Sequence, residues 1–518
     1  MAIVDTTQAI IRRAGAFLSG TMLCRVTGML RDILMAWAFG ATGAVAAFMV
    51  AFRFSHLLRR TLGEGAMQTA FIPQFVAAKH ASETRAIGFF RNLTAVISIL
   101  LVLIIILTEG VLAAAIMQWD LADETTQICK LTMLMLPGLL FICLAGINTA
   151  LLQCEGRYFL ASVAPIAFNV VWITGVLLLS GWTAPAAMPW LAGAVSLACF
   201  AQWLATVPAV AKITSGAPWT LDVKSQDMKN LFKALSLGII GVSSTQINSA
   251  IDAIFATMAS VEGPAYLWYA IRIQQLPLGV FGIALSGALL PALSRAIKAG
   301  DIARSSHYMN FAVRQACLVI LPATFGLFAA GGAIVNLLFG HGDFTEFATI
   351  QTTYCLWGYA IGLPAAVLIL LYGPGFYANN DYATPARGVV YTVLLGVGLN
   401  YLAVCQWSMG PVAVAVTTSI AAWANAAYLH FKLRQRIGTI VTSETFVDIA
   451  KILSACSVAL ATAVFWNSPA ISRDVLTQMI ECTKACSIFT VVFAVTCLVL
   501  RLDLMWGIGM KEETGVSG

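Results

Sequence analysis

Charged side chains are scarce in this chain of 518 residues: Asp, Glu, Lys and Arg together make up 10% of it. A soluble globular domain carries about a quarter of its residues as these four types, so that class of protein is excluded. The net charge of +6 does not indicate nucleic-acid binding either, because the basic residues are scattered singly between apolar segments. No nucleic-acid partner is expected.

The sequence also lacks the common signatures of catalysis and metal binding. Its 12 cysteines contain no Cys-x-x-Cys pair and mostly lie in apolar runs, so neither a disulfide framework nor a zinc site is expected. The five histidines have no metal-ligand spacing, and neither Gly-x-Ser-x-Gly nor a Walker A motif occurs. We expect no catalytic residue, metal or other cofactor, and a loop-shaping role for His341 and Asp343. No cleaved signal peptide is expected.

Apolar residues, by contrast, make up 59% of the chain. Runs of about 20 apolar residues, the length of a transmembrane helix, recur from end to end. The sequence therefore predicts an all-α polytopic membrane protein with about 14 transmembrane helices. The predicted segments are 14–40, 42–60, 88–110, 127–152, 159–181, 187–211, 234–256, 264–290, 309–330, 349–372, 384–407, 411–431, 449–467 and 485–501.

The distribution of Lys and Arg predicts the orientation of these helices. If the N-terminus is cytoplasmic, 21 Lys and Arg fall on the cytoplasmic side, and three, Lys130, Arg473 and Lys484, fall on the other. Basic loops favour the cytoplasmic side of a membrane. We therefore expect both termini in the cytoplasm.

An internal repeat predicts two similar halves. Arg53 and Arg272 lie in related segments and are 219 residues apart, and a second related pair, Pro165 and Pro385, is 220 apart. Two pairs of related segments that are separated by nearly the same number of residues indicate a tandem duplication. Six predicted spans in each copy imply two parallel six-helix lobes around a central cavity, with two extra C-terminal helices. The expected domains are 1–215 (helices 1–6), 216–436 (helices 7–12) and 437–518 (helices 13–14 and a cytoplasmic tail).

Of the 30 Lys and Arg, 21 and three are assigned to the two sides of the membrane, which leaves six arginines inside or at the edge of predicted spans, against three acids at comparable positions. An arginine at mid-bilayer costs roughly 2.5–3.5 kcal/mol, so several are expected only where they line a wet cavity or meet a negative partner. Guanidinium groups match phosphate oxygens bidentately, which favours a phosphate or diphosphate ligand. The arginines are Arg25, Arg31, Arg53, Arg59, Arg60 and Arg272, and the acids are Asp32, Glu64 and Asp252.

Simpler interpretations exist for several of these charges. Arg60 and Glu64 have the spacing of a local ion pair. Asp32 is a candidate counter-ion for Arg25, Arg31 or a neighbouring helix, and Arg59 has the position of a side chain that reaches out to lipid phosphates. Because Arg25 and Arg272 have no acid nearby in the sequence, an anion-binding role is favoured for them.

Asp252 is a lone carboxylate in the seventh predicted span. It could pair with a basic residue or, with Asn248 four residues earlier, bind Na⁺ or a proton. Oxygen-bearing candidates to join it are Asn400, Thr417 and Thr418, although ordinary hydrogen bonding between helices is an equally simple role for them.

Four segments carry a resemblance to a known family: RVTGMLRD (25–32), AFRFSHLLRRTLGEGAMQTAFIP (51–73), LPLGVFGIALSGALLPALS (276–294) and PGFYANNDYATP (374–385). Together with the 14 spans, they resemble the MurJ (MviN) family of lipid II flippases, in the multidrug/oligosaccharidyl-lipid/polysaccharide (MOP) exporter superfamily. The resemblance implies a transporter rather than an enzyme. It would sit in the bacterial inner membrane and move lipid II, an undecaprenyl-diphosphate glycopeptide, to the outer leaflet for peptidoglycan synthesis and so for cell-wall biogenesis and cell shape.

The resemblance also implies roles for particular residues. Arg25, Arg31 and Arg272 match arginines that grip the diphosphate, and Arg59 and Glu64 match further cavity residues. With Arg53 and Asp32, these form the expected substrate-binding site. The resemblance also implies a weak cation site formed by Asp252, Asn400 and Thr418, and a groove for the lipid tail along the two extra helices. Beyond lipid II and membrane lipids, cell-wall synthesis enzymes are candidate partners.

The chain departs from the family pattern at three expected acids, where it has Ala46, Ile271 and Gln275. The absence of these acids makes the expected cavity more positive. The driving force of transport stays open between Na⁺, a proton and the membrane potential.

Three rival functions remain. The first is a MOP transporter that moves another polyprenyl-linked glycan, or a small molecule in exchange for cations. The second is a membrane-embedded glycosyltransferase or ligase, and the third is a scaffold for cell-wall enzymes. A glycosyltransferase should carry a large outer loop with catalytic acids, and the outward polar stretch near Asp120–Glu124 is short.

Overall fold

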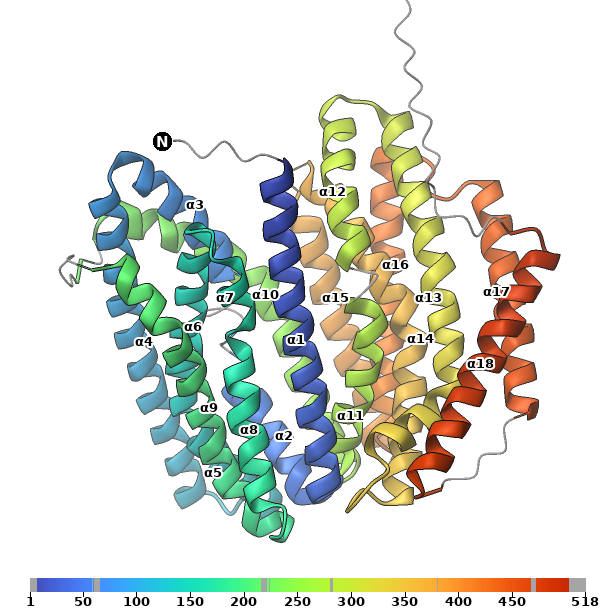
Figure 1. Ribbon diagram of the computed structural model, residues 1–518, viewed down its shortest axis with the longest axis horizontal. Helices are drawn as coiled ribbons and strands as arrows, with labels where there is room; N and C mark the ends of the chain where they lie inside the picture. Colours follow the sequence, from blue (N-terminus) through green and yellow to red (C-terminus); the bar gives the residue numbers. More distant parts are fainter. Residues whose placement is uncertain are drawn as a thin grey trace, which may run out of the picture. The chain divides into compact units, whose positions relative to one another are not determined.

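The computed structural model consists almost entirely of helices (Figure 1). It describes residues 7–57, 59, 66–215, 221–222, 224–279, 283–379, 381–466 and 472–502. The helices are α1 (Thr7–Phe39), α2 (Gly43–Ser55), α3 (Ala66–Ala81), α4 (Glu83–Gln118), α5 (Asp123–Met135), α6 (Pro137–Cys154), α7 (Tyr158–Val163), α8 (Pro165–Leu179), α9 (Ala184–Ile213), α10 (Gln226–Ala259), α11 (Gly263–Pro277), α12 (Ile283–Lys298), α13 (Ile302–Phe339), α14 (Glu346–Tyr377), α15 (Ala383–Asn400), η3 (Tyr401–Gln406), α16 (Val412–Ile437), α17 (Ser443–Trp466) and α18 (Val475–Val499).

The predicted all-α membrane fold is confirmed. Among the described residues, ten helices are long and apolar enough to cross a membrane, and α2 is a shorter apolar helix. Each of the 14 predicted segments coincides with one helix or with two consecutive ones. The segment 127–152, for example, is divided into α5 and α6 directly before Pro137, because proline has no N–H to continue the helical hydrogen bonds. The helix α3 was not among the predicted spans.

Small residues bring α1 close to α7 and α8, the helices beside which it runs (Figure 1). A Cβ atom added at Gly20 would lie 2.0 Å from the Ser162 hydroxyl and 3.0 Å from Ser162 Cβ, so a larger residue here would have to displace the Ser162 side chain. At Gly28 the amide nitrogen of Asn169 comes within 3.8 Å of such a Cβ position. Close backbone approach through small residues is common between membrane helices. Here it brings polar side chains of α8 to the face of α1 that carries Arg31 and Asp32.

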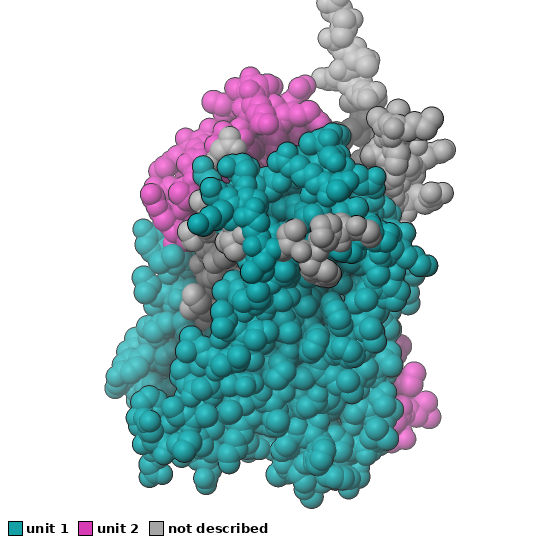
Figure 2. All heavy atoms as spheres, turned by 90° about the vertical axis from the view of Figure 1, so that its left-hand side faces the viewer, with its two compact units in different colours: residues 1–272, 338–355, 389–421 teal, residues 273–337, 356–388, 422–518 magenta. Residues whose placement is uncertain are grey.

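The chain divides into two compact units, coloured separately in Figure 2. Unit 1 comprises residues 1–272, 338–355 and 389–421, and unit 2 comprises residues 273–337, 356–388 and 422–518. The arginine site described below lies in unit 1. The division into two six-helix lobes and a C-terminal pair stays a prediction.

Within unit 2, the last two helices form a packed pair. Buried Ala459 and Ala463 of α17 face Phe489 of α18, and Phe325 and Ala329 of α13 pack against this cluster. The outer surfaces of α17 and α18 carry large exposed apolar side chains, including Phe465, Trp466, Val491 and Leu498. In a membrane protein, such surfaces suit contact with lipid.

Candidate functional site

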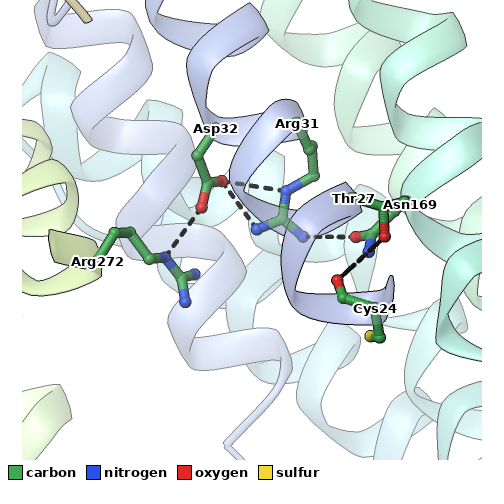
Figure 3. A network of polar contacts seen from close by, with 6 residues as sticks. All are labelled: Cys24, Thr27, Arg31, Asp32, Asn169 and Arg272. Atoms are coloured by element: carbon green, nitrogen blue, oxygen red, sulfur yellow. Dashed lines mark hydrogen bonds and ion pairs between the residues drawn. The ribbon is translucent and has the colours of Figure 1, made fainter. Parts of the chain in front are cut away.

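Two arginines share one carboxylate in unit 1 (Figure 3). Asp32 Oδ1 accepts hydrogen bonds from Arg31 Nε at 3.1 Å and from Arg31 Nη2 at 2.8 Å. Asp32 Oδ2 lies 3.1 Å from Arg272 Nε, on α11. Each carboxylate oxygen thus serves one arginine. The predicted counter-ion role of Asp32 is confirmed, both for Arg31 and for a neighbouring helix.

The contact between Arg31 and Asp32 requires help from α8, because adjacent residues on a helix do not face each other. Asn169 Oδ1 accepts a hydrogen bond from Arg31 Nη1 at 3.3 Å. The ring centroid of Trp172, three residues later on the same face of α8, lies 4.5 Å from Arg31 Cζ. These two side chains hold the guanidinium group alongside α1, where it reaches Asp32.

Arg272 is held in a comparable way from its own helix. Its Cζ lies 4.2 Å from the ring centroid of Trp268, one turn earlier on α11. Trp268 and Trp172 both pack edge-on against Phe52 of α2. The ring centroid of Phe52 lies 5.7 Å from that of Trp268 and 5.0 Å from that of Trp172. Both guanidinium groups therefore rest on one aromatic cluster. Cation–π contacts of this kind gain strength where water is excluded.

Burial divides these charges into two kinds. Arg31 and Asp32 are almost fully buried, whereas 29% of the Arg272 side chain is exposed. Among the residues that the structure describes, the contacts around Asp32 join two cations and one anion. Because an isolated buried charge is costly, the surplus favours the binding of an anion at the exposed part of Arg272.

Arg25 lies on α1, two turns before Asp32, and is half-buried. Among the residues that the structure describes, no hydrogen bond or ion pair reaches its guanidinium group, and it does not join the contacts around Asp32. The structure therefore brings Arg31 and Arg272 together, while Arg25 keeps its donors available to a ligand.

The structure describes only some of the other residues predicted for this site. Arg53 Nη1 donates a hydrogen bond to the backbone oxygen of Ser249 on α10, at 2.8 Å. Arg59 is half-buried, and its backbone N–H donates a hydrogen bond to the carbonyl oxygen of buried His56 at 3.1 Å. Arg60 and Glu64 fall outside the described residues, so their ion pair and the role of Glu64 stay predictions.

A second polar cluster surrounds Asp252 of α10, also in unit 1. Its Oδ1 accepts a hydrogen bond from Asn400 Nδ2 at 3.3 Å, and its Oδ2 accepts from Asn248 Nδ2 at 3.3 Å and Thr418 Oγ1 at 3.2 Å. Thr417 donates in turn to Asn400 Oδ1. All the residues that the sequence suggested for this cluster are thus in contact. The side chains that donate these hydrogen bonds to the carboxylate are neutral, so a cation would require the amide groups to reorient.

At the three positions where the chain departs from the family pattern, the side chain is not a carboxylate. Ala46 is buried in α2, Ile271 is half-buried and Gln275 is exposed. Ile271 directly precedes Arg272, so an acid there would have offered that arginine a second nearby charge.

The loop with His341 and Asp343 is held through its backbone. The Asp343 N–H donates to the carbonyl oxygen of Trp37, near the end of α1, at 3.0 Å. The Tyr269 hydroxyl donates to the carbonyl oxygen of Gly40 at 3.3 Å. Gly342 has a φ of +57°, and a Cβ atom there would lie 2.2 Å from Trp37 O. The close approach requires glycine at this position.

The sequence interpretation missed three residues of the arginine site: Asn169, Trp172 and Trp268. Trp268 lies four residues before Arg272, a spacing that places both on one helix face and could have been noticed. Asn169 and Trp172 lie on a helix with no charged residue. Nothing in their local sequence indicates that they face α1.

Both the sequence and the fold of this chain have known relatives. Residues 35–480 match the family model for lipid II flippase MurJ. The probable lipid II flippase MurJ of Chlamydia pneumoniae is 32% identical over 439 residues, which cover 84% of this chain and 79% of that protein. A solved lipid II flippase MurJ, in an inward closed conformation, has the same fold, with a TM-score of 0.76, 22% identity and coverage of 94% of this chain and 99% of that one. An inward-facing multidrug resistance MATE family transporter of the MOP superfamily is similar at a TM-score of 0.66, with 16% identity and coverage of 82% and 98%.

Proposed function

Because the chain belongs to the MurJ family of lipid II flippases, in the MOP superfamily, we propose that it moves lipid II from the cytoplasmic to the outer leaflet by alternating access. Its role is that of a transporter, and no catalytic group takes part. Family membership favours lipid II over another polyprenyl-linked glycan or a small molecule as the cargo.

The observation that carries the proposal is the pair of arginines around Asp32, with Arg25 on the same helix. Arg25 and the exposed part of Arg272 offer guanidinium donors, and a diphosphate presents the charge and the oxygen geometry that these donors match. Arg31, which is hydrogen-bonded to Asp32, adds positive charge to the same site. Arg53, Arg59 and Glu64 are the further residues that we assign to the headgroup site.

The lipid tail need not enter a polar site. We assign it to the apolar surface of α17 and α18, whose exposed side chains include Phe465 and Val491. Burying apolar surface against a polyprenyl chain carries no desolvation penalty, so the tail can remain in the bilayer while the headgroup crosses.

The driving force follows from the charge of the site. A group with net positive charge responds to the membrane potential by about 2.3 kcal/mol per elementary charge per 100 mV. Asp252, with the side-chain oxygens of Asn400 and Thr418, is our candidate site for a coupled Na⁺ or proton. No other cofactor is required.

The protein is a multi-pass membrane protein. We assign it to the bacterial inner membrane with both termini in the cytoplasm, because 21 Lys and Arg fall on that side against three on the other. Its candidate partners besides lipid II and membrane lipids are the enzymes of cell-wall synthesis, which consume the translocated product.

Depletion in cells tests this function. After depletion, an impermeant probe of outer-leaflet lipid II should report a loss of signal as lipid II accumulates inside. Wild type should restore the signal and Arg272→Ala should not. An unchanged distribution between the leaflets on depletion would refute lipid II as the cargo.

A further inference from the structure

A cavity of about 400 Å³ lies in unit 2, where α12, α14 and α16 end and α13 begins. These helix ends are on the side of the membrane that we assign to the cytoplasm. The polar residues that line the cavity are Asp301, Ser305, Asn379 and Arg436, and isoleucines complete its wall. The volume is in the range of small-molecule sites. The cavity shares no residue with the site around Asp32.

The end of α16 supplies the positive charge of the cavity. Arg436 Nη2 pairs with Asp381 Oδ2, and Arg436 Cζ lies 5.2 Å from the ring centroid of Phe376. A guanidinium group has five N–H donors, so this ion pair leaves donors for a ligand. Phosphate oxygens are the acceptors that such donors match best. This part of the cavity therefore suits a phosphate group.

The turn between α12 and α13 supplies the negative charge. Asp301 Oδ1 accepts a hydrogen bond from the backbone N–H of Arg304 at 2.8 Å, and Asp301 Oδ2 lies 4.0 Å from Arg304 Nε, too far for a strong ion pair. A carboxylate can accept about four hydrogen bonds. Asn379 donates through Nδ2 to the backbone oxygen of Gly375 at 3.4 Å, which leaves its Oδ1 as a further acceptor. These acceptors suit an ammonium group.

One charge of each sign in the lining narrows the class of ligand. Asp301 repels a simple anion, and Arg436 repels a simple cation. A zwitterion that carries a phosphate next to an ammonium group satisfies both residues. Phosphoethanolamine is such a group, and its primary ammonium donates three hydrogen bonds, whereas the trimethylammonium of phosphocholine donates none.

The surroundings of the cavity are those of a membrane interface. Tyr377 and Tyr382, on either side of Asn379 in the chain, are both exposed and stack with their ring centroids 5.5 Å apart. Tyrosine is enriched at the level of the lipid headgroups. Ile302 and Phe446, near the starts of α13 and α17, are 59% and 68% exposed, which suits contact with lipid chains. A lipid is therefore the natural source of the ligand.

We propose that this cavity binds the phosphoethanolamine headgroup of a membrane lipid, with the phosphate at Arg436 and the ammonium at Asp301. The bound headgroup joins the turn before α13 to the end of α16 and so stabilises unit 2. The proposal does not depend on lipid II as the cargo, because the residues that carry it belong to a different site.

Short-chain lipids test the proposal on the full chain in detergent. Dihexanoyl phosphatidylethanolamine should raise the thermal unfolding midpoint, since a ligand of the folded state stabilises it, and a titration of this rise gives the Kd. The matching phosphatidylcholine should bind about ten-fold more weakly, because it lacks the ammonium N–H donors. Free phosphoethanolamine distinguishes the two sources of the group. A Kd as low as that of the lipid would overturn a membrane lipid as the ligand.

Asp301→Asn removes the negative charge and keeps the start of α13 capped, because asparagine caps helices as well as aspartate does. The Kd for phosphatidylethanolamine should rise about ten-fold and approach that for phosphatidylcholine. Asp474→Asn is the matched control in the same unit. Asp474 caps α18 by accepting from the Thr477 N–H at 2.9 Å and does not line the cavity, so its replacement should leave the Kd unchanged.

Arg436→Gln removes the partner of the phosphate and should weaken the binding of both lipids about ten-fold. Arg434→Gln, which removes a neighbouring charge in the last turn of α16, is the control and should change neither Kd. Equal binding of the two lipids by the wild-type protein would overturn the proposal. An undiminished preference for phosphatidylethanolamine in Asp301→Asn would overturn it as well, and this comparison decides even if Arg436→Gln folds poorly.

Discussion

Asp32 and Arg272 form an ion pair between α1 and α11, with 3.1 Å between the carboxylate and guanidinium atoms. The two residues come from opposite halves of the sequence. Asp32 is also bound by its neighbour Arg31, so a single carboxylate balances two cations. Among the described residues, the contacts around Asp32 therefore join more positive than negative charge.

Replacing Asp32 by Asn should destabilise the protein strongly, because Arg31 would keep its charge in a buried position without a counter-ion. Loss of one partner of a buried ion pair costs on the order of 3 kcal/mol. The thermal unfolding midpoint in detergent measures the effect. Asp227→Asn is the control: it removes the partner of exposed Arg85, at 2.8 Å, and should change the midpoint little. Equal shifts in both variants would contradict the role of Asp32.

If a cation binds at Asp252, Na⁺ should raise the unfolding midpoint of the wild-type protein, since a ligand that binds the folded state stabilises it. Asp252→Asn removes the anionic ligand and should abolish the rise. K⁺ at the same ionic strength is the control. A midpoint that responds identically to both ions would exclude a specific Na⁺ site and leave a proton or the membrane potential.

Asp381, in the loop between α14 and α15, makes a pH-dependent contribution to stability. Desolvation opposes its ionisation, but hydrogen bonds from Thr384 and an ion pair with Arg436 at 2.5 Å outweigh it and lower the pKa of the carboxyl. Stability from a lowered pKa is present above the ordinary value of 3.8 and is lost as the pH falls through the folded value.

We therefore expect Asp381→Asn to lower the unfolding midpoint at pH 7, and the difference from wild type to shrink as the pH falls below 3.8. The change should be small, because Arg436 is partly exposed and the pair is screened by water and salt. A difference between variant and wild type that persists at low pH would contradict the ionic origin of the effect.

Gly342→Ala should loosen the contact between the end of α1 and the loop after α13. Its Cβ would overlap the carbonyl oxygen of Trp37, so the hydrogen bond from Asp343 must break or shift. Hydrogen exchange at the Asp343 amide should accelerate. Gly300→Ala is the control: φ is +71° there too, but no atom lies within 4 Å of the added Cβ. It should cost about 1 kcal/mol for the backbone alone and leave exchange at Asp343 unchanged.

The helices were predictable because apolar runs of membrane length are long and unambiguous. The break before Pro137 was not predicted, because prolines such as Pro189 and Pro322 lie inside unbroken helices of this chain. The helix α3, with Lys79 and His80 in its last turn, lacks the length and apolar character of a span. The internal repeat predicts related halves, but a repeat does not specify which side chains meet.

The site was predictable in composition and not in pairing. The cost of charge in a membrane singled out Arg25, Arg31, Asp32 and Arg272. Their contacts could not be foreseen, since Arg31 turns back to its neighbour Asp32 only because Asn169 and Trp172 hold it there. Such contacts depend on which face of α8 packs against α1, and α8 carries no charged residue that would indicate that face.

Flipping of lipid II by the purified protein in liposomes tests the central claim most directly. An enzyme or probe confined to the outside would detect lipid II that reaches the outer leaflet. The account predicts that the wild-type protein transfers lipid II and that Arg473→Ala does so too, because this control alters an exposed arginine far from the site in sequence. It predicts that Arg25→Ala and Arg272→Ala lose transfer while they keep the unfolding midpoint of the wild type. Transfer by these two variants at the wild-type rate would contradict an arginine site for the diphosphate, and no transfer by wild type would contradict the account as a whole.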